Sequence, residues 1–305
     1  MNLKKFIHII LIFSIFLLTS IVVKYLYSAY ENKKNEEKIR LQRKITYEQL
    51  YEDIMPIIKK FNGEVGIFIK DLKTGVEIKY NENKPFPSAS LVKLPLMVAV
   101  FYAVNDGNIT FDTKLKLLKK YKCPGSGILK RYTSGKSFTL RQLIELMITE
   151  SDNTATNMIT EQLGLNYIDW LFKNKLGLKI TNFSRNIMDL KKRSMGIENY
   201  TTASEMVHLL EKIYNGEIIS KETSNEMLTI LKKQKINDRI PRYLPTNLTI
   251  AHKTGLMHDT CHDTGIIFTP KGDFIICILT AEIKNITIAK KFIGNIASKT
   301  YQYYN

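Results

Sequence analysis

Cysteine is scarce in this chain, which has three in 305 residues and no C-x-x-C pair. Thiols so few and so widely spaced exclude a zinc site built on cysteines and a disulfide-rich scaffold. Cys277 lies in the apolar run FIICILT, where we expect a buried thiol on a strand. Cys123 and Cys261 lie in polar, loop-like stretches, and the sequence leaves open whether a disulfide joins them.

Acidic residues are also in short supply, because 29 Asp and Glu face 45 Lys and Arg, a net charge of +16. Such a surplus suits an anionic partner, whether nucleic acid, a membrane face or a wall polymer, and a lysine-rich coding bias accounts for it equally well. The lysines are spread through the predicted helices and strands rather than gathered with aromatics into a stripe. We therefore predict no nucleic-acid groove.

One long apolar run is present, at the N-terminus, where residues 6–23 follow Lys4 and Lys5. Its length is close to the ~20 residues that span a bilayer, and no A-x-A cleavage site follows it. Upstream lysines stay in the cytoplasm and direct the rest of the chain outward. We predict an uncleaved signal anchor over residues 1–29 and a single-pass cell-membrane protein with an extracytoplasmic domain. The alternative is a cleaved signal peptide and a secreted protein.

The charged stretch after this run, residues 30–45, lacks an apolar face and predicts a stalk. The domain that follows, residues 46–305, opens with an amphipathic helix over residues 47–61. Two β-branched runs then flank a turn and predict a hairpin, and helical patterns follow. Three more strands and a final helix are expected within residues 248–301.

Strand patterns at both ends of the domain and helical patterns between them favour an α+β fold. We expect one antiparallel sheet, built from residues of about 46–89 and 246–305 and flanked by helices. An all-helical part, about residues 90–245, is inserted between the two ends. Pockets form preferentially at such a seam, so we expect the functional site there.

Three short motifs occur in order, and the first is an S-x-x-K pattern made by Ser90 and Lys93. On a helix, positions i and i+3 share a face, so the lysine amine reaches the serine hydroxyl. Serine needs an adjacent base to act as a nucleophile, and a lysine serves when burial lowers its pKa. The flanking residues are apolar on every side, which predicts a core position. Pro87 stops any earlier helix, so Ser90 should lie in the first turn, and Pro95 should disturb the second.

The second motif is Ser151-Asp152-Asn153, between two helical runs. All three residue types favour helix N-caps, and the triplet by itself fits a cap. The functional alternative gives Ser151 a hydroxyl that passes a proton to a leaving group. Asn153 would then hold the amide of a substrate.

The third motif is Lys253-Thr254-Gly255, on a predicted strand. The lysine offers a fixed cation and the threonine a hydroxyl, and the glycine lets a substrate backbone lie close against an edge strand. The same three letters occur at residues 73–75, where they fit a hairpin turn. Only the order and spacing of all three motifs are therefore informative.

With these spacings, the chain from residue 47 to the C-terminus resembles the class A β-lactamases and their penicillin-binding relatives. The resemblance implies a β-lactamase-like fold and a serine hydrolase that works through an acyl-enzyme and needs no cofactor or metal. It implies that Ser90 is the nucleophile and that Lys93 is its base or proton relay. Ser151 then protonates the departing nitrogen.

The same resemblance assigns the substrate-binding groups. Asn153 positions the substrate, and Lys253 and Thr254 bind its carboxylate beside Gly255. The backbone N–H groups of Ser90 and Leu256 form an oxyanion hole, which is usually the largest electrostatic contribution in acyl transfer.

One departure from the family pattern concerns the deacylation loop. Class A β-lactamases carry a glutamate there that activates the deacylating water, and Ile187 aligns with that position. Asp189, two residues later, either substitutes as the base or pairs with Arg185 and pins the loop. We favour pinning, because a shift of two residues aims a side chain elsewhere.

A second departure follows the third motif, where Thr264 replaces the arginine that many β-lactamases have. His258, Asp259, His262 and Asp263 crowd this region. Loop histidines are more often solvated than metal-bound, so we predict no metal site.

Three functions fit these residues. The first is hydrolysis of the amide of a β-lactam ring with slow deacylation. The second is a D-alanyl-D-alanine carboxypeptidase or peptidase that acts on cell-wall peptide. The third is a penicillin-binding sensor or sink that stays acylated. In each case we expect a small-molecule or wall-peptide partner and a monomer.

Overall fold

The computed structural model describes residues 3–304, so Met1, Asn2 and Asn305, at the limits of the expected anchor and domain, lie outside the described residues. The helices are α1 (Leu3–Lys59), α2 (Lys93–Asn105), α3 (Leu140–Thr149), α4 (Asn153–Leu163), α5 (Leu165–Asn174), α6 (Leu190–Ser194), α7 (Ala203–Asn215), α8 (Lys221–Lys232) and α9 (Ile286–Gln302). The short 3₁₀ turns are η1 (Ala89–Val92), η2 (Lys119–Tyr121), η3 (Leu129–Arg131) and η4 (Ile240–Tyr243). The strands are β1 (Glu64–Asp71), β2 (Glu77–Tyr80), β3 (Phe86–Pro87), β4 (Lys114–Lys116), β5 (Ser137–Thr139), β6 (Tyr200–Thr201), β7 (Ile250–Leu256), β8 (Cys261–Ile267) and β9 (Phe274–Ala281).

Five strands form one antiparallel sheet in the order β2-β1-β9-β8-β7. The N-terminal strand β1 pairs along its whole length with the C-terminal strand β9, from Glu64↔Ala281 to Asp71↔Phe274. The predicted hairpin between β1 and β2 is present. The α+β prediction, with one sheet built from both chain ends and flanked by helices, is therefore confirmed.

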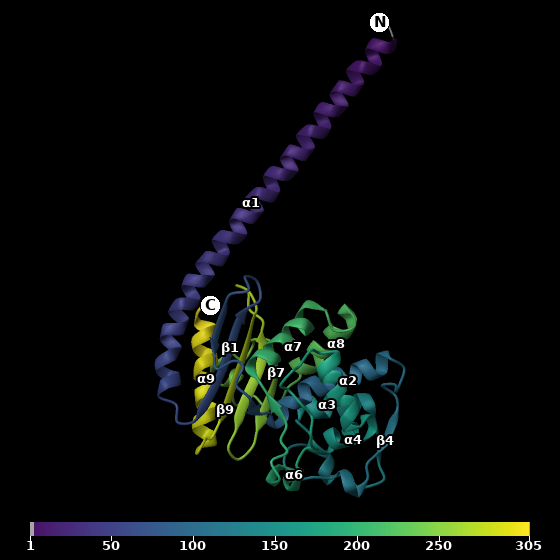
Figure 1. Ribbon diagram of the computed structural model, residues 1–305, viewed down its shortest axis with the longest axis vertical. Helices are drawn as coiled ribbons and strands as arrows, with labels where there is room; N and C mark the ends of the chain where they lie inside the picture. Colours follow the sequence, from purple (N-terminus) through teal and green to yellow (C-terminus); the bar gives the residue numbers. More distant parts are fainter. Residues whose placement is uncertain (1–2, 305) are drawn as a thin grey trace.

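The two faces of the sheet are buried in two separate cores. On β9, Ile276 and Ile278 pack with the last turns of α1 and with α9, whereas Cys277 and Leu279 face the helical part of the chain. This alternation follows from the period of two along a strand. Cys277 is fully buried on a strand, as predicted. Figure 1 shows the resulting layers: α1 and α9 on one side of the sheet, and α7 with the remaining helices on the other.

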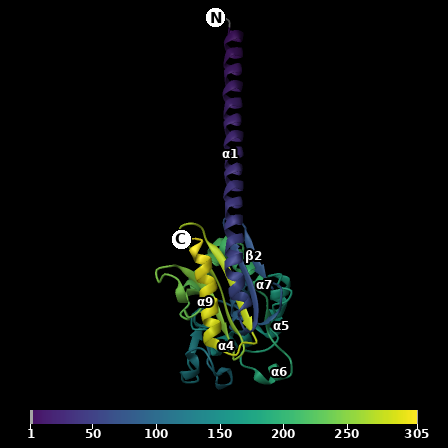
Figure 2. The ribbon, with the colours of Figure 1, turned by 90° about the vertical axis from the view of Figure 1, so that its left-hand side faces the viewer.

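The first helix is longer than predicted. The predicted stalk, residues 30–45, is itself helical, and no new helix begins at residue 47, because α1 runs without a break from Leu3 to Lys59. Residues 30–45 contain no glycine or proline and are rich in Lys, Glu and Arg, which are good helix formers even without an apolar face. Figures 1 and 2 show the N-terminal part of α1 extending away from the domain, and its apolar window is not covered by any other element.

Side chains of the domain hold α1 in place near Arg43 and Tyr47. Arg43 Nε lies 3.0 Å from the buried carboxylate of Asp71, and its guanidinium stacks 4.2 Å from the ring centroid of Tyr304. The Tyr304 hydroxyl donates to Asp71 Oδ2 (2.7 Å) and contacts the hydroxyl of Tyr47. A buried, mutually bonded set of this kind fixes α1 against the C-terminal end of the chain.

The middle of the chain is less purely helical than predicted. It contains β4 and β5, which pair with each other, and β6, which pairs with β3 just before this part of the chain. The pair of β3 and β6 joins the segment before Ser90 to the segment that follows the expected deacylation loop. These pairs are only two and three residues long, too short for a periodic sequence signal.

Candidate active site

Ser90 and Lys93 lie at the junction between η1 and α2. Ser90 belongs to the 3₁₀ turn, and Lys93 is the first residue of α2. The prediction that Ser90 opens the helix is therefore wrong by one short turn. Pro95 consequently falls in the first turn of α2, where its missing N–H breaks no helical hydrogen bond, so it does not disturb the second turn as predicted.

The backbone just before Ser90 is strained. Ala89 has a φ of 48°, a left-handed conformation that is unfavourable for a residue with a Cβ. Contacts on either side hold it in place. A Cβ on Gly255 of β7 would lie only 3.3 Å from the Ala89 Cβ, and Pro87 O accepts a hydrogen bond of 2.8 Å from His262 Nε2. Strain of this kind persists only where the surroundings over-determine it, as at catalytic sites.

Lys93 is fully buried and links the first motif to the second. Its Nζ donates to Ser151 O (2.7 Å) and Asn153 Oδ1 (2.7 Å) and lies 3.3 Å from Ser151 Oγ. Among the described residues it makes no hydrogen bond to Ser90. Burial lowers the pKa of Lys93 to about 7, although the negative charge of Asp152 opposes the shift. A substantial fraction of this amine is therefore neutral at physiological pH and can accept a proton.

Lys253, also fully buried, approaches the same hydroxyl from β7. Its Nζ donates to Ser151 Oγ (3.0 Å) and to Thr254 O (2.8 Å). Burial lowers the pKa of Lys253 well below its ordinary value, and the nearby cations of Lys93 and Arg239 lower it further. The Ser151 hydroxyl thus lies between two buried amines whose pKa values are both lowered, an arrangement suited to passing a proton.

The second motif supplies a helix cap and side chains that contact the lysines of the other two motifs. Asp152 is the N-cap of α4, because its Oδ1 accepts from Ala155 N (2.9 Å), so the cap prediction is confirmed for this residue. Its neighbour Ser151 has a left-handed φ of 52°. Asn153 uses Oδ1 for Lys93 and donates from Nδ2 to Pro124 O (3.0 Å). The second N–H of its amide makes no hydrogen bond among the described residues.

A glycine loop that sequence analysis missed packs on this motif. A Cβ on Gly127 would lie 2.2 Å from Asp152 Cγ, and one on Gly125 would lie 2.7 Å from Asn153 Nδ2. Both glycines have positive φ angles, of 102° and 87°. The tetrapeptide Pro-Gly-Ser-Gly was the available signal, because two glycines so close together indicate close backbone approach.

The third motif lies on β7, which is the edge strand of the sheet. Thr254 and Gly255 are buried, whereas Leu256, at the end of the strand, is 42 % exposed. The close approach of Gly255 to Ala89 brings the end of β7 beside η1, the turn that carries Ser90. An unpaired strand edge next to a serine allows an extended substrate to be held along its backbone.

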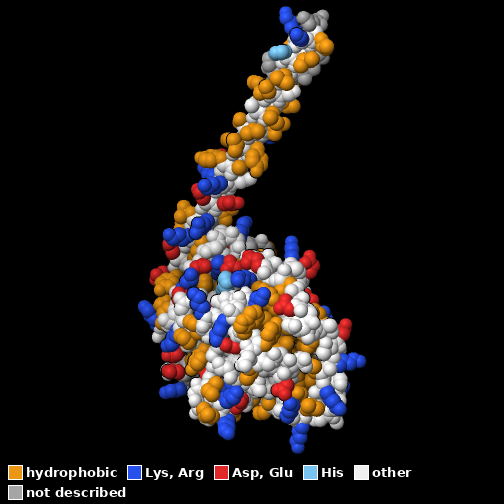
Figure 3. Space-filling model, turned by 45° about the vertical axis from the view of Figure 1, so that its right-hand side comes forward, with side chains coloured by type: hydrophobic (Ala, Val, Ile, Leu, Met, Phe, Trp, Pro, Cys, Tyr) orange, Lys and Arg blue, Asp and Glu red, His pale blue; other side chains and the backbone are white. Residues whose placement is uncertain are grey.

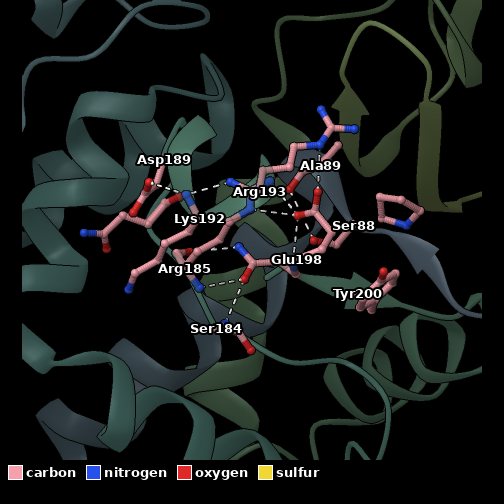
Figure 4. Close-up of polar contacts among 12 residues, drawn as sticks. Ser88, Ala89, Ser184, Arg185, Asp189, Lys192, Arg193, Glu198 and Tyr200 are labelled. Atoms are coloured by element: carbon pink, nitrogen blue, oxygen red, sulfur yellow. Dashed lines mark hydrogen bonds and ion pairs between the residues drawn. The ribbon is translucent and has the colours of Figure 1, made fainter. Parts of the chain in front are cut away.

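Figure 4 shows the expected deacylation loop, in which the predicted pairing of Asp189 with Arg185 is wrong. Arg185 Nε donates instead to Glu198 Oε1 (2.9 Å), and Arg193 Nε lies 3.0 Å from Glu198 Oε2. Asp189 is the N-cap of α6 and accepts from Lys192 N (3.0 Å). Sequence analysis missed Glu198 as the partner of Arg185. The two residues are 13 positions apart and are brought together by closure of the loop, which leaves no periodic signal in the sequence.

Ile187, in the same loop, is only 8 % exposed and packs in the core of the helical part. Its carbonyl accepts from Asn157 Nδ2 (3.4 Å), a side chain on α4 one turn beyond Asn153. This contact ties the Ile187 backbone to the helix that carries the second motif. No carboxylate occupies position 187, and residues 185–199 contain only two acids, Asp189 and Glu198.

The region after the third motif differs from expectation. Cys261 and His262 were assigned to a loop, but β8 already begins at Cys261, and both side chains are fully buried. His262 is therefore not solvated as expected, whereas His258 is exposed. The three cysteines are all free, so the disulfide that the sequence left open between Cys123 and Cys261 is not formed.

Burial also sets the protonation of His262, because it lowers the pKa of this side chain to about 4. Nε2 donates to Pro87 O and Nδ1 accepts from Thr280 N (3.1 Å), so the neutral ring satisfies both backbone groups. The charges of Arg239 and Asp259 act in opposite directions on it.

A folded-state pKa below the ordinary value means that His262 stabilises the fold above about pH 6.5. The contribution falls by about 1.4 kcal/mol per pH unit down to about pH 4, about 3 kcal/mol in total. Urea unfolding at pH 7.5 and pH 4.5 should show a smaller difference for His262→Asn than for the wild type. Equal differences in the two proteins would contradict this assignment, and His258→Asn, at an exposed site, is the control.

Comparison with known proteins agrees with this geometry. Among characterised relatives, β-lactamase VEB-1 of Pseudomonas aeruginosa is 26% identical over 262 residues, which cover 81% of this chain and 88% of that protein. A β-lactamase structure from Sphaerobacter thermophilus matches with a TM-score of 0.77 and 30% identity, over 83% of this chain and 97% of the other. PBP-A matches with a TM-score of 0.77 and 28% identity, over 83% and 95%.

A variant of PBP-A that was solved as an acyl-enzyme complex with penicillin G matches equally well, with a TM-score of 0.77 and 29% identity. The family model described as the beta-lactamase enzyme family matches residues 49–304, from the base of α1 to the last described residue. This match covers most of the chain, and the three motifs lie together at one site. The chain therefore belongs to the beta-lactamase enzyme family.

Proposed function

We propose that the chain opens the amide of a β-lactam ring with the Ser90 hydroxyl and releases the resulting acyl-enzyme slowly. In the first step the Ser90 oxygen bonds to the carbonyl carbon, and its proton passes to the neutral amine of Lys93. The buried position of Lys93 and its pKa of about 7 support this role, because a base works best when its pKa lies near the operating pH.

In the second step the carbon–nitrogen bond breaks and the departing nitrogen takes a proton from Ser151. The Ser151 oxygen accepts hydrogen bonds from the amines of Lys253 and Lys93, so its own O–H is left to donate into the site. The proton that Lys93 removed from Ser90 replaces the one that Ser151 gives up. The observation that supports this path for the proton is that Lys93 and Lys253 both contact the Ser151 hydroxyl.

Substrate binding is assigned to the end of β7 and to Asn153. The carboxylate of a β-lactam would lie against Lys253 and Thr254 and would favour the charged form of the lysine that burial disfavours. The N–H groups of Ser90 and Leu256 would receive the developing oxyanion. The left-handed Ala89 and the missing side chain of Gly255, which bring η1 and β7 together, support this placement.

One observation carries slow deacylation: both acids of the loop are already engaged. Asp189 caps α6, and Glu198 is paired with Arg185 and Arg193. The position that aligns with the family's glutamate is the buried Ile187. A water beside the ester therefore lacks a carboxylate to deprotonate it.

A time course of intact-protein mass after addition of penicillin G tests the proposal and its alternatives. Slow turnover predicts an adduct that persists for many minutes and then declines. A permanent adduct would instead indicate a penicillin-binding sensor or sink. Release of D-alanine from a D-alanyl-D-alanine peptide at a rate above that of penicillin turnover would indicate a cell-wall peptidase.

The rate of acylation should rise with pH through about 7 and then level off. Below this pH Lys93 is protonated and cannot take the proton of Ser90, whereas above it the amine is free. Labelling by a fluorescent penicillin between pH 5.5 and 8.5 measures the profile. Lys93→Arg, which stays charged, should give a low rate with no rise near pH 7. A wild-type rate that increases toward acid pH would rule out Lys93 as the base.

We further propose that the N-terminal part of α1 is an uncleaved membrane anchor that holds the catalytic domain outside the cytoplasm. Its apolar window is not covered by any other element, and the apolar run is followed by Tyr25, Tyr27 and Tyr30, all exposed. Tyrosines at this position suit the interface between hydrocarbon and water.

Full-length protein should therefore be found in the membrane fraction, from which detergent releases it and high salt does not. A salt wash removes proteins that are held by charge alone, so it serves as the control for the basic surface of this chain. A soluble secreted form that begins near residue 30 would show instead that the apolar run is a cleaved signal peptide.

A further inference from the structure

Although Lys and Arg occur along the whole chain, residues 113–141, which we call the basic segment, hold nine of the 45. It has no acidic residue, and the next one is Glu145. Lys120 pairs with Glu161, and Arg141 pairs with Glu226. Among the described residues the other seven cations have no ion pair; these are Lys114, Lys116, Lys119, Lys122, Lys130, Arg131 and Lys136.

The segment folds back on itself, so that several of its cations lie close to distant parts of the same segment. Lys122 donates to the carbonyl of Tyr132, and Lys130 donates to the carbonyl of Gly125. Lys136 stacks over the Tyr132 ring at 4.7 Å, and Lys116 lies close to Gly135. Charges that are distant in the sequence are therefore near neighbours in space, and their potentials add.

This surface lies on the side of the domain away from α1. Figure 1 shows β4, which carries Lys114 and Lys116, on the opposite side of the domain from α1 and α9. α6, with the exposed Lys191, lies at the end farthest from the free end of α1. Figure 3 shows lysine and arginine side chains projecting from that same end.

If the chain is anchored through α1, the basic segment cannot reach the lipid of that same membrane. About 20 helical residues lie between the apolar run and Arg43, and they alone hold the domain ~30 Å from the bilayer. We propose that the basic segment binds a polyanionic polymer of the cell envelope, a flexible chain that carries a phosphate or carboxylate on each repeat. The inference that this surface faces away from the membrane rests on the anchor proposal, whereas the excess of positive charge in the basic segment does not.

The form of the surface favours a polymer over a small anion. Its cations are mostly exposed lysines, spread over several turns and strands rather than directed into one pocket. Such a surface neutralises many charges of a polymer at once and gains affinity by releasing its counterions. The segment also contains the loop at Gly125 and Gly127, which packs on Asn153 and Asp152. A bound polymer would therefore hold the catalytic site close to the wall.

Fluorescence anisotropy of the full chain in a neutral detergent, titrated with labelled polyphosphate, tests the proposal. The segment variant combines Lys114→Gln, Lys116→Gln, Lys119→Gln and Arg131→Gln. Its matched control removes four exposed lysines elsewhere, by Lys59→Gln, Lys60→Gln, Lys284→Gln and Lys291→Gln.

At 0.1 M salt the segment variant should lose at least about tenfold in affinity, and the control should change less than about twofold. The slope of log affinity against log salt should fall by ~0.7 for each charge removed, as for a flexible polyanion. Polyglutamate replaces polyphosphate in a second arm, and tighter binding of one identifies the anionic group. Labelling of each variant by a fluorescent penicillin is measured separately, so loss of Ser90 chemistry is not confused with loss of polymer binding.

Three results would overturn the proposal. Equal losses in the two variants would show that binding follows net charge rather than this surface. Failure of the wild type to bind either polymer at 50 mM salt would show that the surface is merely solvated. Tighter binding of anionic phospholipid vesicles than of both polymers, lost in the segment variant, would make a membrane the partner.

Discussion

Ser90→Ala is expected to abolish covalent labelling by a fluorescent penicillin, the largest effect of any single substitution in this chain. The loss of a nucleophile that acts together with partner groups costs on the order of 10⁴ to 10⁶ in rate. Lys93 and Ser151 would remain hydrogen-bonded to each other in the variant, so the fold of the site should persist. Gel fluorescence after brief exposure to the reagent measures the result.

Ser134→Ala is a matched control for this experiment, since Ser134 is an exposed serine in a loop outside the three motifs. It should label like the wild type. Persistent labelling of Ser90→Ala, at the wild-type rate, would show that another side chain carries the acyl group and would end the assignment of the nucleophile.

Ile187→Glu is expected to shorten the life of the penicillin adduct by ~10² to 10⁴, the contribution of a general base, or about 3 to 5 kcal/mol of barrier. Because Ile187 is buried, a polar side chain there also costs stability. Ile187→Gln has nearly the same shape without the base and controls for that cost. Intact-protein mass spectrometry at successive times measures the adduct, and equal lifetimes for the Glu and Gln variants would contradict the assignment.

Asp189→Asn separates the two roles considered for Asp189. Asparagine is an equally good N-cap, so α6 should stay intact and the adduct lifetime should not change. A longer-lived adduct in an equally stable protein would show that Asp189 is a working base. Rapid multiple turnover of penicillin by the wild type would point to the same conclusion.

The sheet and the three motifs were predictable because their signals are local. Apolar periodicity marked the strands of both chain ends, and the S-x-x-K spacing keeps Ser90 and Lys93 one turn apart along the chain. The buried polar strand β8 was partly missed, because its first residues, Cys261 to Asp263, are not an apolar run although they lie in the core. Tertiary context decided their burial.

Contacts between distant loops were not predictable. Glu198 replaced Asp189 as the partner of Arg185, and His262 reached Pro87 across 175 positions of sequence. Neither contact follows from the period of a helix or a strand, because loop closure and sheet register bring the partners together. The length of α1 was missed for a local reason. The helix propensity of the residues in 30–45 was sufficient to continue the helix, although this stretch has no apolar face.

α1 is unbroken, and Asp71 and Tyr304 fix it to the domain at Arg43. The number of helical residues before Arg43 therefore sets the position and the orientation of the domain relative to the start of the helix. Each residue inserted into a continuous helix raises the body above it by ~1.5 Å and turns it by ~100°. A chain anchored through this helix would hold the site at Ser90 at one height above the bilayer and facing one direction. Inserting two residues would leave the height nearly the same and point the site almost the opposite way.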